Sequence, residues 1–138
     1  MINLSEKTIH ATAVVIGGKA ALIIGPSGSG KSSLALQLIG MGASLVADDQ
    51  CEIFVEGGSV TVRRPPPLPE AIEARGVGLL RAPMSEPAEI SVVVNMERLA
   101  TDRFPEKQTV EILGHHIAMI DKSDAPHFPS AVLLYLTH

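Results

Sequence analysis

The stretch that decides the fold is Gly25-Pro26-Ser27-Gly28-Ser29-Gly30-Lys31-Ser32, called here the glycine-rich loop. These residues fit the Walker A pattern in full. The glycines let the backbone curl so that successive N–H groups point inward, and together with the N-terminus of the following helix they form a cradle for an anion. Lys31 supplies a positive charge to the β- and γ-phosphates of a nucleotide, and the Ser32 hydroxyl can ligate Mg²⁺. The loop therefore predicts nucleotide binding.

The residues on either side of the loop have the pattern that such a loop requires. Residues 19–24 are a short apolar run typical of a strand, and residues 32–41 carry leucine and alanine at helical spacing. Residues 44–47 form a second short apolar run. Strand, loop, helix and strand in this order predict a βαβ unit over residues 19–49.

Asp48 and Asp49 follow the second strand of this unit directly. Ligands in such sheets bind outside the carboxyl ends of the strands, so both carboxylates are expected close to the glycine-rich loop. One carboxylate there can hold Mg²⁺, and the other can take the proton of an attacking hydroxyl. The alternative is that the pair is only a polar turn or helix cap after a strand. Beside a complete phosphate loop the functional interpretation is favoured.

Most of the remaining chain is strand-like. Residues 8–16 are rich in apolar and β-branched side chains and lead through Gly17-Gly18 into the strand before the loop, which predicts a tight hairpin. A second hairpin is predicted over residues 51–64, around Gly57-Gly58.

Shorter segments complete the expected fold. Residues 70–75 predict one helical turn. Residues 130–135 are apolar and fit a helix or a strand, and Pro129 just before them slightly favours a helix start. Strands are predicted at residues 88–95, 110–113 and 117–120. Together these elements predict an α/β fold with a P-loop, a mixed sheet and few helices, which differs from a regular doubly wound domain.

The length, composition and charge of the chain limit which classes of protein it can belong to. A length of 138 residues predicts a single domain over residues 1–138, and 46% hydrophobic residues are typical of a globular chain. The net charge of −4, without any long run of Lys or Arg, argues against nucleic-acid binding. No apolar run approaches the ~20 residues that span a bilayer, and no signal-peptide pattern is present, so a cytoplasmic protein is expected. Cys51 is the single cysteine and is expected to be a small buried side chain.

Three further features carry weaker signals. His10 lies in the first predicted strand, where a lone histidine is usually structural. Glu73 and Arg75 precede a Gly-Val-Gly triplet that would let the backbone and Arg75 approach an anion. The His115-His116 pair has no further ligands at zinc spacing, so no metal site is expected there.

Taken together, these residues resemble the catalytic domain of bacterial HPr kinase/phosphorylase. The likeness covers roughly residues 8–120. Four stretches carry it: Ile9-His10-Ala11-Thr12, the glycine-rich loop, Leu45-Val46-Ala47-Asp48-Asp49, and Glu73-Ala74-Arg75-Gly76-Val77-Gly78-Leu79-Leu80. The combination is much more specific than the loop alone. It implies the fold of the HPr kinase C-terminal domain, which is like that of PEP carboxykinase.

The resemblance also implies an activity and roles for particular residues. The activity is ATP- and Mg²⁺-dependent phosphorylation of a serine on HPr, the phosphocarrier of the sugar phosphotransferase system, and in many members also reverse phosphorolysis to pyrophosphate. Asp48 would be the general base for the serine hydroxyl. Asp49 would assist either by binding the metal ion or by orienting Asp48. Catalytic roles are implied for Asp48, His10, Lys31 and Arg75, and magnesium ligation for Ser32, Asp49 and Glu73.

The chain departs from the family pattern at several points. Members of the family usually carry an N-terminal domain that these 138 residues do not include, so the resemblance is to short forms of the enzyme. Ser33 stands where a Glu commonly follows the loop serine, and residues 121–130 contain Lys122 in place of a functional arginine. These departures weaken the expectation of phosphorolysis, of HPr affinity and of the usual hexameric homo-oligomer. They do not affect the expectation of ATP binding.

Two alternative functions remain open from the sequence. One is a small-molecule kinase, although such enzymes normally carry more helices and an arginine-rich lid. The other is a nucleotide-sensing module that binds ATP without transferring phosphate.

Overall fold

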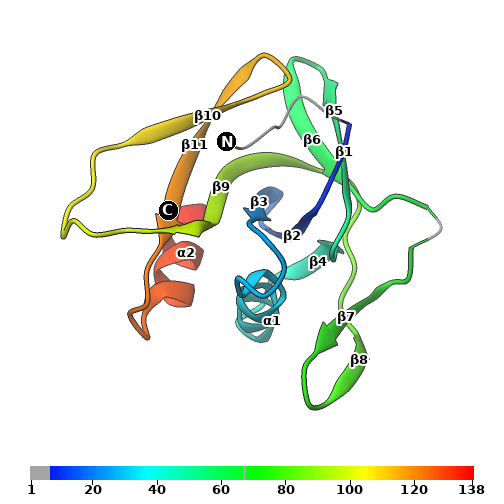
Figure 1. Ribbon diagram of the computed structural model, residues 1–138. Helices are drawn as coiled ribbons and strands as arrows, with labels where there is room; N and C mark the ends of the chain where they lie inside the picture. The colour runs from blue at the N-terminus through cyan, green and yellow to red at the C-terminus, as the bar shows by residue number, and fades with distance from the viewer. Residues whose placement is uncertain (1–6, 67) are drawn as a thin grey trace.

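The computed structural model describes residues 7–66 and 68–138, which form a curled β-sheet, a separate hairpin and two helices (Figure 1). In chain order the elements are β1 (Thr8–Ile9), β2 (Ala11–Ile16), β3 (Lys19–Ile24), α1 (Lys31–Gly40), β4 (Ser44–Ala47), β5 (Cys51–Glu56), β6 (Ser59–Arg63), β7 (Ala71–Ala74), β8 (Gly78–Arg81), β9 (Ala88–Leu99), β10 (Gln108–Ile112), β11 (His115–Lys122) and α2 (Phe128–Thr137). The predicted mixed sheet with few helices is confirmed.

The large sheet has the order β1-β5-β6-β9-β3-β2-β4, and β11 pairs with the second edge of β9 and with β10. One edge of the long strand β9 is covered by β3, while its other edge is shared between β6 near the start and β11 further along. This division bends the sheet around β9, as Figure 1 shows. The strands β3, β9 and β11 run parallel, so their carboxyl ends meet at one edge of the molecule.

The predicted βαβ unit is present, with one strand inserted into it. Both β3 and β4 pair antiparallel with β2, which lies between them, so β3 and β4 run in the same direction. Helix α1 makes the connection and packs against β2, β3 and β4. The glycine-rich loop and the end of β4 are thereby brought to the same edge of the sheet.

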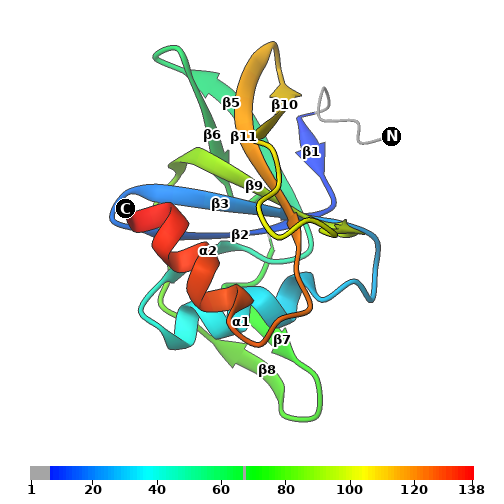
Figure 2. The ribbon, with the colours of Figure 1, turned by 90° about the vertical axis from the view of Figure 1, so that its left-hand side faces the viewer.

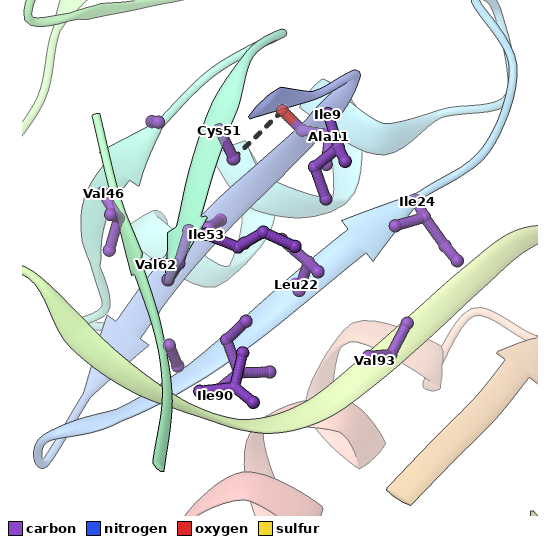
Figure 3. Close-up of a cluster of buried hydrophobic side chains, with 14 of the residues drawn as sticks. Ile9, Ala11, Leu22, Ile24, Val46, Cys51, Ile53, Val62, Ile90 and Val93 are labelled. Atoms are coloured by element: carbon purple, nitrogen blue, oxygen red, sulfur yellow. Dashed lines mark hydrogen bonds between the residues drawn. The ribbon is translucent and has the colours of Figure 1, made fainter. Parts of the chain in front are cut away.

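Two apolar clusters lie on opposite faces of the sheet. Ala13, Val15 and Leu22 face the inside of the curl, where Figure 3 shows Leu22 beside Ile53 and the side chains of neighbouring strands. The alternate residues, such as Val14 and Ile23, face the helices. Both helices lie on that side of the sheet, while the β5–β6 and β10–β11 hairpins rise on the other side (Figure 2). Strands buried on both faces explain the nearly continuous apolar runs in the sequence.

Cys51 is buried in the inner cluster, which confirms the expectation for the single cysteine. Its thiol donates a hydrogen bond of 3.3 Å to the Ala11 carbonyl (Figure 3). Burial, together with the nearby charges of Asp48 and Asp49, raises the pKa of this thiol well above its ordinary value. The side chain is therefore a neutral packing group.

Both predicted Gly-Gly hairpins are confirmed. Gly17 and Gly18 connect β2 to β3, and Gly57 and Gly58 connect β5 to β6. All four have positive φ between 59° and 80°, which is the conformation that two-residue hairpin turns require.

The predicted helical turn at residues 70–75 is wrong. Ala71–Ala74 is strand β7, which pairs antiparallel with β8. Within β7 the burial alternates, because Ile72 packs into the cluster beneath α1 while Glu73 is exposed. This period of two is a strand pattern, and it arises from packing against α1 rather than from local propensity.

The first predicted strand is interrupted at His10, which lies at a bend between β1 and β2 rather than inside a strand. β1 pairs with β5, whereas β2 pairs with β3 and β4, so the chain changes partners at this residue. The strands predicted at residues 88–95, 110–113 and 117–120 are present and longer than expected, apart from Leu113, which lies in the turn after β10. The helix predicted at Pro129 is confirmed as α2, with proline in its first turn.

Each helix has ten residues, and within residues 7–66 and 68–138 neither is long and apolar enough to cross a membrane.

Removing a large side chain from the buried face of α1 should lower the stability of the protein. Leu38 is 1% exposed in the cluster between the helices and the sheet. Leu38→Ala is expected to lower the free energy of unfolding by about 2–5 kcal/mol, because it removes buried methyl groups and leaves a cavity. Leu134→Ala on α2 is the control, since Leu134 is 60% exposed and should cost less than about 0.5 kcal/mol. Urea unfolding measures both, and equal losses would contradict this packing.

Candidate functional site

The glycine-rich loop connects β3 to α1 in a conformation suited to an anion. Gly28 and Gly30 have φ of 82° and 98°, values that glycine adopts without strain. The Ser29 N–H donates to the Pro26 carbonyl at 3.1 Å, which closes a tight turn within the loop. Gly30 caps α1 without a side-chain hydrogen bond, and the first turn of α1 carries no acidic residue. The positive end of the helix is therefore free to meet a phosphate.

Lys31 lies at the start of α1 with only 6% of its surface exposed. Its ammonium donates a hydrogen bond of 3.0 Å to the Pro26 carbonyl, so its partner is a neutral group of the loop itself. Burial lowers the pKa of Lys31 below the ordinary value for lysine, while the charges of Asp49 and Asp48 oppose that change. In the described part of the chain this ammonium has no direct carboxylate partner, and a buried ammonium of that kind favours an incoming anion.

Asp48 is held against the loop by two hydroxyl groups. Its Oδ1 accepts hydrogen bonds from Thr12 Oγ1 at 2.9 Å and from Ser32 Oγ at 2.8 Å. From residues 7–66 and 68–138, its Oδ2 accepts only a long contact of 3.4 Å, from the Glu73 backbone N–H. The carboxylate therefore has one oxygen fixed beside the glycine-rich loop and one oxygen available for a further proton donor.

Asp49 follows with a φ of 72°, which is unusual outside glycine and more tolerated by Asp than by most residues. This conformation turns its side chain away from that of Asp48. Its Oδ1 lies 2.7 Å from His10 Nε2, which donates because a carboxylate can only accept. The two adjacent carboxylates thus have different partners, one on the loop and one on the bend before β2.

A cleft of about 490 Å³ joins these groups. Most of the residues singled out from the sequence line it: His10, Lys31, Ser32, Asp49, Glu73 and Arg75, together with Ser27, Gly28 and Gly30 of the loop. Asp48 lies between Ser32 and Glu73, which both line the cleft. The loop, the end of β4 and the β7–β8 hairpin therefore meet at one place, although β7 was expected to be helical.

The oxygen atoms here fit a magnesium ion bound together with phosphate. Ser32 Oγ lies against Asp48, whereas Asp49 lies against His10, so the hydroxyl and carboxylate that meet are Ser32 and Asp48. Within residues 7–66 and 68–138, no three His, Cys, Asp or Glu side chains gather closely enough to hold a metal ion by themselves. Mg²⁺ commonly takes only one or two carboxylates and completes its shell with substrate phosphates and water. The donor set agrees with that mode.

Thr12 is a site residue that the sequence reasoning missed. Its side chain is fully buried, donates to Asp48 Oδ1, and lies 3.4 Å from the Asp49 N–H as an acceptor. The signal was a single hydroxyl in the otherwise apolar run of residues 11–16, two residues after His10. Only the pairing of β2 with β4 brings it to the aspartates.

Gly25 is where the loop passes most closely over β9. A Cβ at this position would lie 2.7 Å from Ser29 Oγ and 3.1 Å from Met96 Cβ, and φ is 148°. Gly25→Ala should therefore reduce stability by about 1–3 kcal/mol and weaken nucleotide binding, because the loop must shift. Gly40→Ala is the control, since Gly40 is exposed near the end of α1, lacks a positive φ, and its Cβ would meet open space. Urea unfolding and ATP titration test this, and equal behaviour of both variants would contradict the close approach.

Comparison with known proteins gives a consistent result. The family model of the HPr serine kinase C-terminal domain matches residues 3–123. HPr kinase/phosphorylase 1 of Oceanobacillus iheyensis is 36% identical in an alignment 133 residues long that covers 91% of this chain and 41% of that protein. HPr kinase/phosphorylase of Burkholderia lata is 35% identical in an alignment 130 residues long that covers 82% of this chain and 39% of that protein. The chain thus spans about two fifths of the length of the curated relatives it matches.

Among solved structures, the HPr(Ser) kinase/phosphatase from Coxiella burnetii superposes with a TM-score of 0.75 at 25% sequence identity. The match covers 94% of this chain and 86% of that chain. The fold class expected from the resemblance is therefore confirmed.

Proposed function

This chain belongs to the family of HPr serine kinase C-terminal domains, and from that premise we propose that it is an ATP-dependent protein-serine kinase. Its substrate would be HPr, the phosphocarrier of the phosphotransferase system, and the same site would run the reverse phosphorolysis. The names of the relatives support both directions, since they are called HPr kinase/phosphorylase.

The observation that carries the proposal is the position of Asp48. Thr12 and Ser32 hold its Oδ1 beside the glycine-rich loop, while Oδ2 makes a long contact with the Glu73 N–H. A general base must be oriented within hydrogen-bond reach of the hydroxyl it deprotonates. A carboxylate fixed by one oxygen and free at the other meets that requirement next to a phosphate cradle.

The proposed transfer follows from this arrangement. The glycine-rich loop (Gly25, Pro26, Ser27, Gly28, Ser29, Gly30, Lys31 and Ser32) holds the phosphates of ATP. The acceptor serine oxygen bonds to the γ-phosphorus as Asp48 takes the hydroxyl proton, and the bond from that phosphorus to the β–γ bridging oxygen breaks to release ADP. In phosphorolysis, an oxygen of inorganic phosphate bonds to the phosphorus of phosphoserine, and the bond from that phosphorus to the serine oxygen breaks. Protonated Asp48 gives its proton to the departing serine oxygen, so that free serine and pyrophosphate are the products.

The remaining side chains of the cleft have supporting roles. Lys31 and Arg75 stabilise charge on the phosphoryl group in transit. His10 holds Asp49 through the 2.7 Å contact and so orients the second carboxylate. Ser32, Asp49 and Glu73 are the proposed Mg²⁺ ligands, and Asp48 is added to them because it contacts Ser32. A bound Mg²⁺ would neutralise phosphate charge.

We also propose a domain organisation, an oligomeric state and a cellular location for the protein. Residues 1–138 act as one P-loop kinase catalytic domain, and the family resemblance supports a homo-oligomer, a hexamer in the usual members. The reaction is assigned to the cytoplasm, where ATP is available.

The experiment is to incubate the protein with Mg-ATP and purified HPr and to look for phosphoserine that is stable in acid. Phosphoserine on HPr is the expected result. Tight ATP binding without transfer would overturn the kinase assignment in favour of a nucleotide sensor. Transfer to a metabolite in place of HPr would overturn it in favour of a small-molecule kinase.

A further inference from the structure

A second lysine reaches the glycine-rich loop from a distant part of the chain. Lys122 ends β11, one of the three parallel strands whose carboxyl ends meet at the loop. The pairing of β11 with β9 shifts at this residue, since Asp121 pairs with Asn95 but Lys122 pairs with Leu99. Irregularities of this kind re-aim a side chain at a strand end.

The contact of Lys122 is with the loop backbone rather than with the cleft. Its ammonium donates to the Ser29 carbonyl at 3.5 Å, and Asp124 lies 3.9 Å from the same nitrogen. The Lys122 carbonyl accepts a hydrogen bond of 2.8 Å from the Ala100 N–H, which fixes its backbone. Lys122 is absent from the residues that line the cleft, so its effect on a bound phosphate must pass through the loop.

The planar geometry of the peptide unit between Ser29 and Gly30 determines how this contact orients the Gly30 N–H. In a trans peptide the C=O and the next N–H point in opposite directions. An ammonium that holds the Ser29 carbonyl on one side therefore turns the Gly30 N–H to the other side. The Ser29 N–H is already used by the Pro26 carbonyl, so both peptide groups flanking Ser29 are fixed.

We propose that Lys122 is a positioning residue for phosphate binding: it holds the Ser29 carbonyl so that the Gly30 N–H faces the nucleotide phosphates. The positive charge also polarises that peptide and strengthens its N–H as a donor. This inference rests on the nucleotide-binding part of the proposed function and is independent of the identity of the acceptor.

The test compares Lys122→Met and Lys122→Arg with a matched control, Lys107→Met, in an exposed loop. Calorimetry measures the Kd of each variant for Mg-ATP and for pyrophosphate. Lys122→Met is expected to bind both about three- to tenfold more weakly, since one backbone hydrogen bond of the loop loses its support. Arginine also donates to a carbonyl and should restore the affinity to within about twofold. Lys107→Met should bind like the unaltered protein.

A spectroscopic readout separates positioning from a general loss of stability. On addition of pyrophosphate the Gly30 amide resonance of the unaltered protein should move, and in Lys122→Met this movement should be much smaller. With HPr as acceptor, KM for ATP should rise while kcat changes little.

Either of two results would overturn the proposal: unchanged Kd values in Lys122→Met, or failure of Lys122→Arg to restore them. If HPr is never phosphorylated but the affinity pattern holds, the positioning role stands and the proposed kinase function fails.

Discussion

Asp48→Asn is expected to slow phosphoryl transfer to HPr by about 10²–10⁴-fold while ATP binding stays within a few-fold of the unaltered protein. The substitution keeps an oxygen that can accept hydrogen bonds from Thr12 and Ser32. It keeps an oxygen ligand for Mg²⁺ but removes the carboxylate charge that takes the serine proton, so the main loss should appear in kcat.

The measurement is a single-turnover assay with HPr and Mg-ATP, beside calorimetry for ATP affinity. Asp102→Asn is the matched control, because Asp102 is an exposed carboxylate in the segment after β9 and should retain full activity. Full transfer by Asp48→Asn would remove Asp48 from its role as the base. A loss of ATP binding equal to the loss of rate would make it a binding residue.

Lys31→Met is expected to weaken ATP binding by about ten- to a hundredfold. Methionine keeps an apolar stem in a site that is almost fully buried, so the change removes the charge with little loss of packing. The missing ammonium leaves the β- and γ-phosphates without their cation. ATP titration measures the effect, and retained affinity would show that the glycine-rich loop does not bind the phosphates.

Lys19→Met provides the control for that variant, since Lys19 is an exposed lysine at the far end of the same strand that leads into the loop. The lowered pKa of Lys31, caused by burial against the opposing charges of Asp49 and Asp48, adds a pH dependence. As the pH rises, Lys31 loses its proton before an ordinary lysine would. ATP affinity in the unaltered protein should therefore decline at a lower alkaline pH than an exposed lysine predicts.

The part of the fold that could be predicted is the part that local patterns determine. The segment from β3 to β4 could be predicted because its strands, its helix and the glycines between them each have a characteristic local sequence pattern. The Gly17-Gly18 and Gly57-Gly58 hairpins were readable because their turn conformations demand those residues. Strand β7 was not readable, because its short sequence suits a helical turn as well, and Ile72 packing beneath α1 decides the outcome.

In the candidate site, too, some residues could be predicted from a local pattern and others could not. The loop residues follow from one contiguous motif, whereas the contacts of Asp48 depend on strand order. Thr12 is 36 residues away and meets Asp48 only because β2 pairs with β4. Lys122 lies 93 residues from Ser29 and arrives through the pairing of β9 with β11. Neither register is encoded in a local pattern, so neither contact could be predicted.

The central claim is that one cleft holds ATP by the glycine-rich loop and passes its terminal phosphoryl group to a serine of HPr beside Asp48. It is tested most directly by ATP labelled with ³²P at either the α- or the γ-phosphate. The expected result is γ-label on a single HPr serine, stable in acid, with no transfer of α-label. Release of the γ-label only as free inorganic phosphate, or its retention in bound ATP, would contradict the claim.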